Sequence, residues 1–112
     1  MTAITSHVLD TSLGRPIAGL GVALARLDQG VFVELGQACT DADGRVKQLL
    51  GSNRLVAGIY RLSFETGAHY ASVGRDTFYE RVELEFRVTD PSQHYHVPLL
   101  LSPFGYSTYR GS

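Results

Sequence analysis

The sequence has no tryptophan, only one cysteine and no long apolar run. Because Cys39 stands alone, an internal disulfide is excluded and a reducing compartment is indicated. No apolar stretch approaches the roughly 20 residues that a membrane-spanning helix needs. The start, MTAITSHVLD, has neither a basic region nor an apolar core, so no secretory signal is expected. A cytoplasmic location is the simplest expectation.

The sequence also lacks an excess of charge of one sign. Ten Lys and Arg are scattered among eleven Asp and Glu, and the net charge at pH 7 is -1. Nucleic acids and anionic membranes are bound by basic patches, so neither is an expected partner. The 112 residues predict one domain, residues 1–112, with a real core but no large internal pocket. A binding site is therefore expected in a surface cleft or between subunits.

Short alternating segments separated by turns make up most of the chain. Strands are predicted at about 4–9, 20–27, 31–40, 46–50, 55–65, 81–89, 94–101 and 106–112. A brief helix is predicted at 66–74, where Thr66 can cap the first turn and Gly74 can end the last. About eight strands with one short helix predict an all-β sandwich of two sheets.

The stretch from residue 94 to residue 112, HYHVPLLLSPFGYSTYRGS, is dense in polar and reactive groups. Side chains alternate along a strand, so His94 and His96 share one face. A turn at 102–105 would return the final strand, 106–112, beside His96. Imidazole, phenol, guanidinium, hydroxyl and a terminal carboxylate would then lie close together. Such a group of side chains suits the polarisation of a small polar substrate.

Three separated motifs resemble those of the 5-hydroxyisourate hydrolases, the transthyretin-related proteins of purine catabolism. They are SHVLDTSLGRPIAGLGVAL at 6–24, TDADGRV at 40–46 and the ending HYHVPLLLSPFGYSTYRGS at 94–112. The resemblance implies a transthyretin-like sandwich and a homotetramer, a dimer of dimers with active sites at a subunit interface. It also implies hydrolysis of 5-hydroxyisourate to 2-oxo-4-hydroxy-4-carboxy-5-ureidoimidazoline, on the route from urate to allantoin, with no cofactor.

The same resemblance assigns catalytic roles to His7, Arg45, His96 and Ser112, and substrate contacts to His7, Arg45 and Tyr109. Taken alone, a strand histidine such as His7 is more often structural, and an arginine after an Asp-Gly turn is more often solvated. A guanidinium nevertheless suits a purine-like substrate or the oxyanion of an attacked amide. One of His7 and His96 would deprotonate the attacking water. Spacing leaves open which of the two it is.

Other interpretations of these residues stay open. Three imidazoles could hold zinc, but no metal is expected, because no cysteine or carboxylate stands beside them in the motif. His94 is expected to be structural or to support a residue that contacts the substrate, and Arg15 and Arg110 are undecided between packing and catalysis. A metal-dependent hydrolase and a non-catalytic transthyretin-like carrier of small molecules are the alternatives. A carrier of hydrophobic ligands would have an apolar channel, whereas this chain would line its channel with His7, Arg45, His96 and Tyr109.

Overall fold

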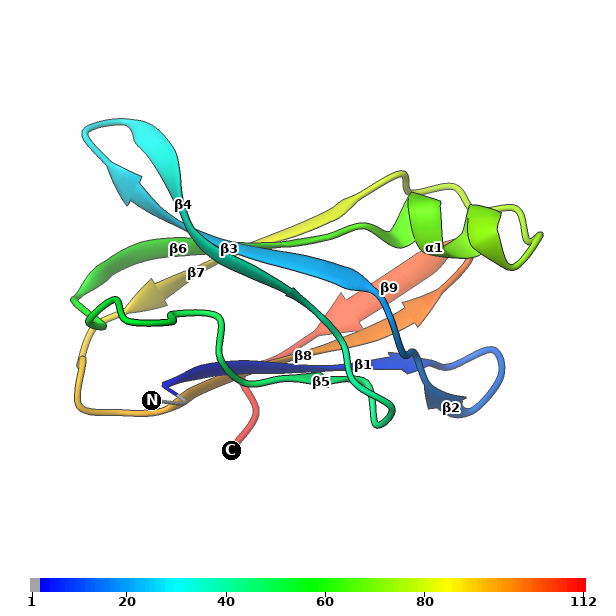
Figure 1. Ribbon diagram of the computed structural model, residues 1–112, viewed down its shortest axis with the longest axis horizontal. Helices are drawn as coiled ribbons and strands as arrows, with labels where there is room; N and C mark the ends of the chain where they lie inside the picture. The colour runs from blue at the N-terminus through cyan, green and yellow to red at the C-terminus, as the bar shows by residue number, and fades with distance from the viewer. Residues whose placement is uncertain (1–2) are drawn as a thin grey trace.

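Alternation of apolar and polar residues along the strands gives two β-sheets that face one another, with one short helix at an end of the sandwich (Figure 1). The computed structural model describes residues 3–112. Met1 and Thr2, where the predicted domain begins, lie outside the described residues. The prediction of an all-β, two-sheet sandwich is confirmed.

The first sheet carries the residues that the sequence singled out. Its strands are β2 (Arg15–Pro16), β1 (Ile4–Asp10), β8 (Tyr95–Ser102) and β9 (Gly105–Thr108) in that order, and β5 (Arg45–Val46) also pairs with β1. Strands β1 and β8 are parallel, while the other pairings in this sheet are antiparallel. An early strand and a late strand therefore lie side by side at the centre of the sheet.

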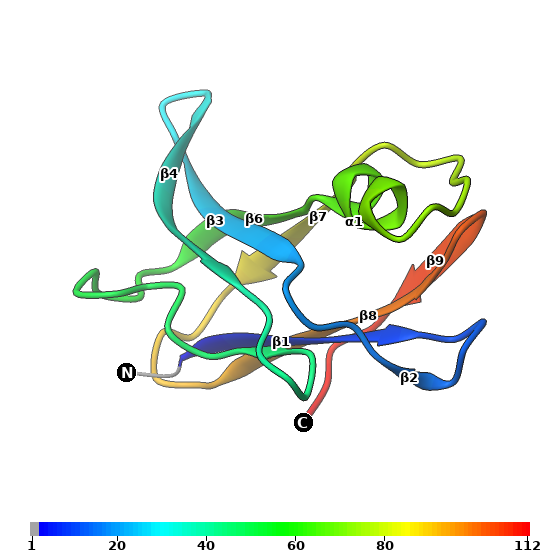
Figure 2. The same ribbon diagram turned by 45° about the vertical axis from the view of Figure 1, so that its right-hand side comes forward.

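The second sheet is antiparallel throughout and covers the inner face of the first. Its order is β4 (Val31–Cys39), β3 (Gly21–Asp28), β6 (Gly58–Phe64) and β7 (Val82–Val88). Figure 2 shows the two sheets from the side, with the helix α1 (Thr66–Ser72) beside one end of the second sheet. No helix within residues 3–112 is long and apolar enough to cross a membrane.

The core fixes which side chains face outward. Strand β1 buries Ile4 and Val8, and β8 buries Tyr95, Val97, Leu99 and Leu101 against the second sheet. Alternation then turns His7 and His96 to the outer face. A one-residue slip of β1 would bury the His7 imidazole in place of Val8, so the packing of the core holds this register.

Several strand limits differ from the prediction. The final strand ends at Thr108, and beyond it only Gly111 pairs again, as an isolated bridge to His96. The strand predicted at 46–50 is reduced to the two residues of β5, and the two-residue β2 was not predicted. These short pieces bring the count to nine strands rather than about eight.

The predicted helix is present, but the predicted cap is wrong. Glu65 stands at the N-cap and makes no capping hydrogen bond with its side chain. Thr66 is fully buried, and its hydroxyl donates to the carbonyl oxygen of Tyr79 at 3.1 Å. The threonine therefore fastens the loop after the helix instead of the first turn of the helix. The helix ends at Ser72, and Gly74 follows it with a positive φ of 71°.

Candidate active site

Strand register gathers three of the predicted residues on the outer face of the first sheet. The parallel pairing of β1 with β8 places Thr5 beside His96, and the antiparallel pairing of β1 with β5 places His7 beside Arg45. Thr5 and His7 are two residues apart on one strand, so they share a face. Segments from the beginning, middle and end of the chain therefore meet at this point.

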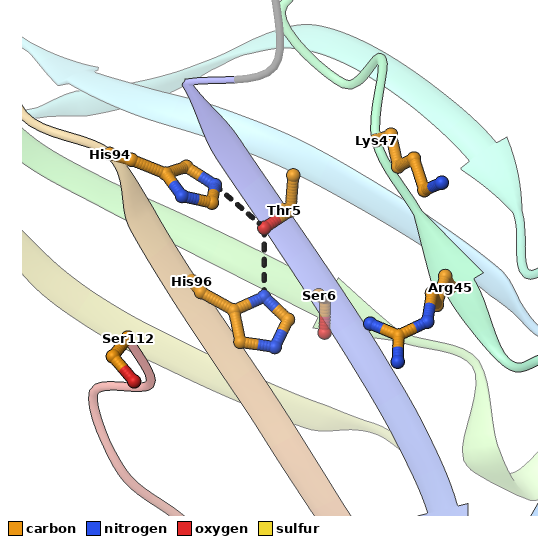
Figure 3. A pocket seen from close by; sticks show the side chains of 7 residues that line it. All are labelled: Thr5, Ser6, Arg45, Lys47, His94, His96 and Ser112. Carbon is orange, nitrogen blue, oxygen red and sulfur yellow. Dashed lines mark hydrogen bonds between the residues drawn. The ribbon is translucent and has the colours of Figure 1, made fainter.

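These side chains form a cleft of about 410 Å³. Seven residues line it, and all of them are polar: Thr5, Ser6, Arg45, Lys47, His94, His96 and Ser112. In Figure 3 the His96 ring lies between the side chains of Ser112 and Arg45. The chain thus brings Arg45, His96 and Ser112 together in one cleft, whereas His7, which pairs with Arg45, is not one of the lining residues.

Thr5 is the centre of a hydrogen-bonded group of three side chains (Figure 3). Its Oγ1 lies 2.9 Å from Nε2 of His94 and 2.8 Å from Nδ1 of His96. Only 8 % of Thr5 is exposed, because the two imidazoles cover it. The hydroxyl therefore holds both rings, and it leaves Nε2 of His96 without a partner among the described side chains.

A tight turn before β5 positions Arg45. The Asp41 carboxylate accepts hydrogen bonds from the backbone N–H groups of Asp43 (2.9 Å) and Arg45 (3.0 Å). Gly44 adopts a φ of 79°, and a Cβ there would lie 2.5 Å from the carbonyl oxygen of Val8. Only glycine fits this approach to β1, so the Asp-Gly pair explains how the guanidinium reaches the cleft.

His7 makes a hydrogen bond that fixes the position of one of its protons. Its Nε2 lies 2.8 Å from the carbonyl oxygen of Asp43. A carbonyl oxygen only accepts hydrogen bonds, so this nitrogen carries a proton and donates it. In the neutral ring the free lone pair of His7 is therefore on Nδ1.

The tail closes the other side of the cleft. The backbone N–H of Gly111 donates to the carbonyl oxygen of His96 at 2.8 Å, which sets the adjacent Ser112 at the edge of the cleft. A Cβ at position 111 would lie 2.6 Å from Cδ2 of His96. The imidazole thus rests directly on the backbone of Gly111, with Thr5 on its Nδ1 edge.

The surroundings of His96 favour its neutral form. Burial is the main cause that lowers its pKa below the ordinary value, and electrostatic repulsion from His94, Arg45 and His7 acts in the same direction. A neutral imidazole can accept a proton near neutral pH. The arrangement therefore combines a base with a guanidinium that can stabilise negative charge.

Comparison with known proteins places the chain in a family. A family model described as the HIUase/Transthyretin family matches residues 4–111. The chain belongs to this family. It is 44 % identical over 116 residues to the 5-hydroxyisourate hydrolase of Caulobacter vibrioides, with 100 % of both chains covered. The resemblance seen in the three sequence motifs is thereby confirmed.

Two solved structures of the HIUase/Transthyretin type are also similar to this chain. The 5-hydroxyisourate hydrolase of Klebsiella pneumoniae superposes with a TM-score of 0.87 at 38 % identity and covers 100 % of both chains. Sea bream transthyretin in complex with thyroxine superposes with a TM-score of 0.90 at 29 % identity and covers 97 % of this chain and 94 % of that chain. Fold alone therefore does not separate a hydrolase from a protein that binds thyroxine.

Some of the residues that the sequence singled out lie outside the cleft. Tyr109 is 58 % exposed and lines a second groove together with residues of β7, whereas it is not among the residues that line the cleft. Arg110 lies over the Tyr95 ring, 4.4 Å from its centroid, and donates to the carbonyl oxygen of His94 at 3.2 Å. Arg15 is exposed in β2, beside Asp10. Arg110 thus packs within the chain, whereas the substrate role of Tyr109 stays a prediction.

Three residues that line the cleft, Thr5, Ser6 and Lys47, were not predicted as site residues. Thr5 lies two residues before His7, and Lys47 lies two residues after Arg45, so alternation along an extended chain was a signal for both. Across residues 3–112, the His, Cys, Asp and Glu side chains form no group of three or more that could hold a metal ion. The expectation of a metal-free site stays a prediction.

Proposed function

We propose that this protein is a hydroxyisourate hydrolase, which opens the cyclic amide of 5-hydroxyisourate by attack of water. The observation that carries the proposal is the cleft itself, where an imidazole favoured in its neutral form faces a guanidinium. The names of its relatives point to the same substrate. The product is the ring-opened carboxylate, 2-oxo-4-hydroxy-4-carboxy-5-ureidoimidazoline, on the route from urate to allantoin.

The roles of the side chains follow from their chemistry. Arg45 offers a planar set of donors to the substrate carbonyl and to the oxyanion that forms when water attacks. An imidazole, His96 or His7, takes the proton of the attacking water. As the tetrahedral intermediate collapses, the carbon–nitrogen bond breaks, the ring nitrogen receives a proton, and the new carboxyl group ionises. Ser112 lies at the edge of the cleft, where its hydroxyl can orient the substrate.

Assembly is the second part of the proposal. The cleft opens to solvent on the outer face of a single chain. Charged groups stabilise an oxyanion more strongly where bulk water is excluded. A homotetramer, a dimer of dimers with these faces opposed, would cover each cleft and bring in Tyr109 from another subunit. The cytoplasmic location stays a prediction from the sequence.

A small-molecule carrier is the alternative function, favoured by the similarity to sea bream transthyretin. The polar lining of the cleft counts against it, because sites for hydrophobic ligands are lined mostly by apolar and aromatic side chains. A carrier would bind such a ligand without changing it.

The test follows the ultraviolet decay of freshly generated 5-hydroxyisourate. The wild type should accelerate the decay, and His96→Asn should lower kcat by about 100-fold or more, the usual contribution of a general base. His69→Asn, in α1 and away from the cleft, is the matched control and should keep the full rate.

Two results would count against this assignment. Decay no faster than the spontaneous rate would reject the hydrolase, and full activity of His96→Asn would reject the site. The same assay with a chelator separates the metal-dependent alternative, because loss of activity on chelation would show that the histidines work through a metal.

A further inference from the structure

The bridge that Thr5 makes between two histidines restricts where their protons lie. A threonine hydroxyl has one hydrogen, so it donates to at most one of the two imidazoles and accepts from at least one. Accepting from both would leave the hydrogen of this buried hydroxyl without a partner, so it donates to one ring and accepts from the other. In one arrangement it donates to Nδ1 of His96, and the proton of that ring is then on Nε2, facing the cleft. In the other it donates to Nε2 of His94 and accepts from Nδ1–H of His96, so Nε2 of His96 is free.

The composition of the cleft decides between the two arrangements. Arg45 and Lys47 only donate hydrogen bonds, and the Ser6 hydroxyl already donates to the carbonyl oxygen of Val97. None of the described residues that line the cleft is an Asp or a Glu. Among the side chains that line the cleft, donors are therefore in surplus, and a free lone pair of sufficient basicity is what hydrolysis still requires. His7 has a free lone pair on Nδ1, but it is not one of the lining residues. Nε2 of His96 can supply the lone pair, but only when the proton of that ring is on Nδ1.

We propose that Thr5 and His94 are positioning residues that hold the proton of His96 on Nδ1, so that Nε2 is the base of the cleft. The proton chain runs from His96 Nδ1–H to the Thr5 hydroxyl, and from that hydroxyl to Nε2 of His94. This inference rests on the proposed hydrolase function and assigns the base that the reaction needs. It also gives His94 a role beyond simple packing.

The surroundings of His94 suit an acceptor. Its Nε2 is occupied by Thr5, while its ring is exposed. Its backbone is held by Arg110, whose guanidinium donates to the His94 carbonyl oxygen, and His96 stands 6.3 Å away between ring centroids. His94 and Arg45 both oppose a positive charge on the His96 imidazole.

The relay makes a prediction about acid. A protonated His94 has hydrogens on both nitrogens and can no longer accept from Thr5. The hydroxyl must then donate to Nδ1 of His96, and the proton of the neutral His96 ring shifts to Nε2. Protonation of either imidazole therefore removes the free lone pair on Nε2 of His96. The groups that face this pair are Thr5 and His7 on β1, Arg45 on β5, and Arg110 and Ser112 on the tail.

The experiment records long-range ¹H–¹⁵N spectra of the four histidines in the substrate-free protein, because the ring nitrogen shifts identify the tautomer directly. The wild type should show His96 protonated on Nδ1. In Thr5→Val the Nδ1–H would be buried without an acceptor, so the proton should move to Nε2, where water accepts it. Thr5→Ser keeps the hydroxyl and should restore the wild-type tautomer.

The kinetic arm uses the same variants. We expect Thr5→Val to lower kcat by about 10- to 100-fold, part of the usual effect of a general base, with little change in KM. His94→Leu should give the same tautomer shift and a similar loss of kcat. His69→Leu is the matched control. If Thr5→Val does not fold, the His94→Leu spectra decide the question.

The outcomes separate this inference from the proposed function. A wild-type His96 protonated on Nε2, or an unchanged tautomer in both Thr5→Val and His94→Leu, overturns the relay. The predicted tautomer in a protein that does not hydrolyse 5-hydroxyisourate upholds the relay and rejects the hydrolase.

Discussion

Gly111 shows how the absence of a side chain can position the His96 ring in the cleft. A Cβ at this position would lie 2.6 Å from Cδ2 of His96, and that ring cannot turn away without losing its hydrogen bond to Thr5. We therefore expect Gly111→Ala to lower kcat/KM by about 100-fold, because displacement of a reacting group by about 1 Å has effects of this size. The rate of 5-hydroxyisourate decay measures the loss.

Gly105→Ala is the control for this prediction, since its added Cβ would meet only the Ser102 Oγ, at an ordinary 3.8 Å. It should keep both activity and melting temperature. Gly111→Ala should keep the melting temperature to within a few degrees, because the crowded ring lies on the surface of the sheet. An active Gly111→Ala variant would mean that His96 has more freedom than this packing allows.

For single residues, the sequence predicted which side chains form the cleft better than it predicted the hydrogen bonds between them. The family motifs identified Arg45, His96 and Ser112, which line one cleft, but they did not show that Thr5 joins His94 to His96. That contact depends on the parallel register of β1 with β8, which no local pattern specifies. Tyr109 fits the motif equally well, yet its place in a second groove depends on how the tail leaves β9.

Among the elements, the helix α1 is fastened to the first sheet through Asp10. This carboxylate is 2 % exposed and accepts hydrogen bonds from the Tyr70 hydroxyl (3.2 Å) and the Arg75 guanidinium (3.1 Å). It also accepts from Ser12 and from the backbone N–H of Leu13. Burial and the neighbouring Asp10 charge raise the pKa of Tyr70 to about 12, so its hydroxyl stays a donor. Asp10 is therefore the link between helix and sheet.

Replacing Asp10 by Ala should lower the free energy of unfolding by about 3 kcal/mol, since a buried carboxylate and its ion pair are lost while its donors stay buried. Chemical denaturation of variant and wild type measures the difference. Glu85→Ala, an exposed carboxylate on β7, is the control and should change stability by less than about 0.5 kcal/mol.

The same link predicts a dependence on pH. Burial alone would raise the pKa of Asp10, but hydrogen bonds from Ser12, Tyr70 and Leu13 outweigh it and hold the pKa below its ordinary value of 3.8. The stabilisation is complete above the unfolded-state pKa and is lost as pH falls through the lowered one. The difference in stability between wild type and Asp10→Ala should therefore be constant at neutral pH and shrink under acid. A difference that grew under acid would contradict this assignment.

Strand faces could be predicted because burial follows alternation, as in β1, β7 and β8. Which strands pair could not be predicted, since β2 and β5 are only two residues long and form only because they are hydrogen-bonded to β1. The cap of α1 was mistaken for a similar reason. Thr66 has the right residue type, but a loop that returns from Tyr79 takes its hydroxyl.

For the whole molecule, the proposed assembly has a direct test. Light scattering should give a mass near four times the 12.2 kDa of one chain. If Tyr109 contacts the substrate in the site of another subunit, the Tyr109→Ala and His96→Asn variants should each have low activity on their own. Refolded together, they should regain activity, because mixed assemblies contain sites with both residues intact. Activity no higher than the average of the two separate variants would place Tyr109 outside the site.

The parallel pairing of β1 with β8 has a consequence for biosynthesis. Residues 4–10 leave the ribosome early but have no neighbour for their inner edge until residues 95–101 emerge and align with them. Pairing between such distant segments is also slow to form, because a long loop must close first. The growing polypeptide is therefore inert through most of its translation, and turnover begins only once its last strands have docked.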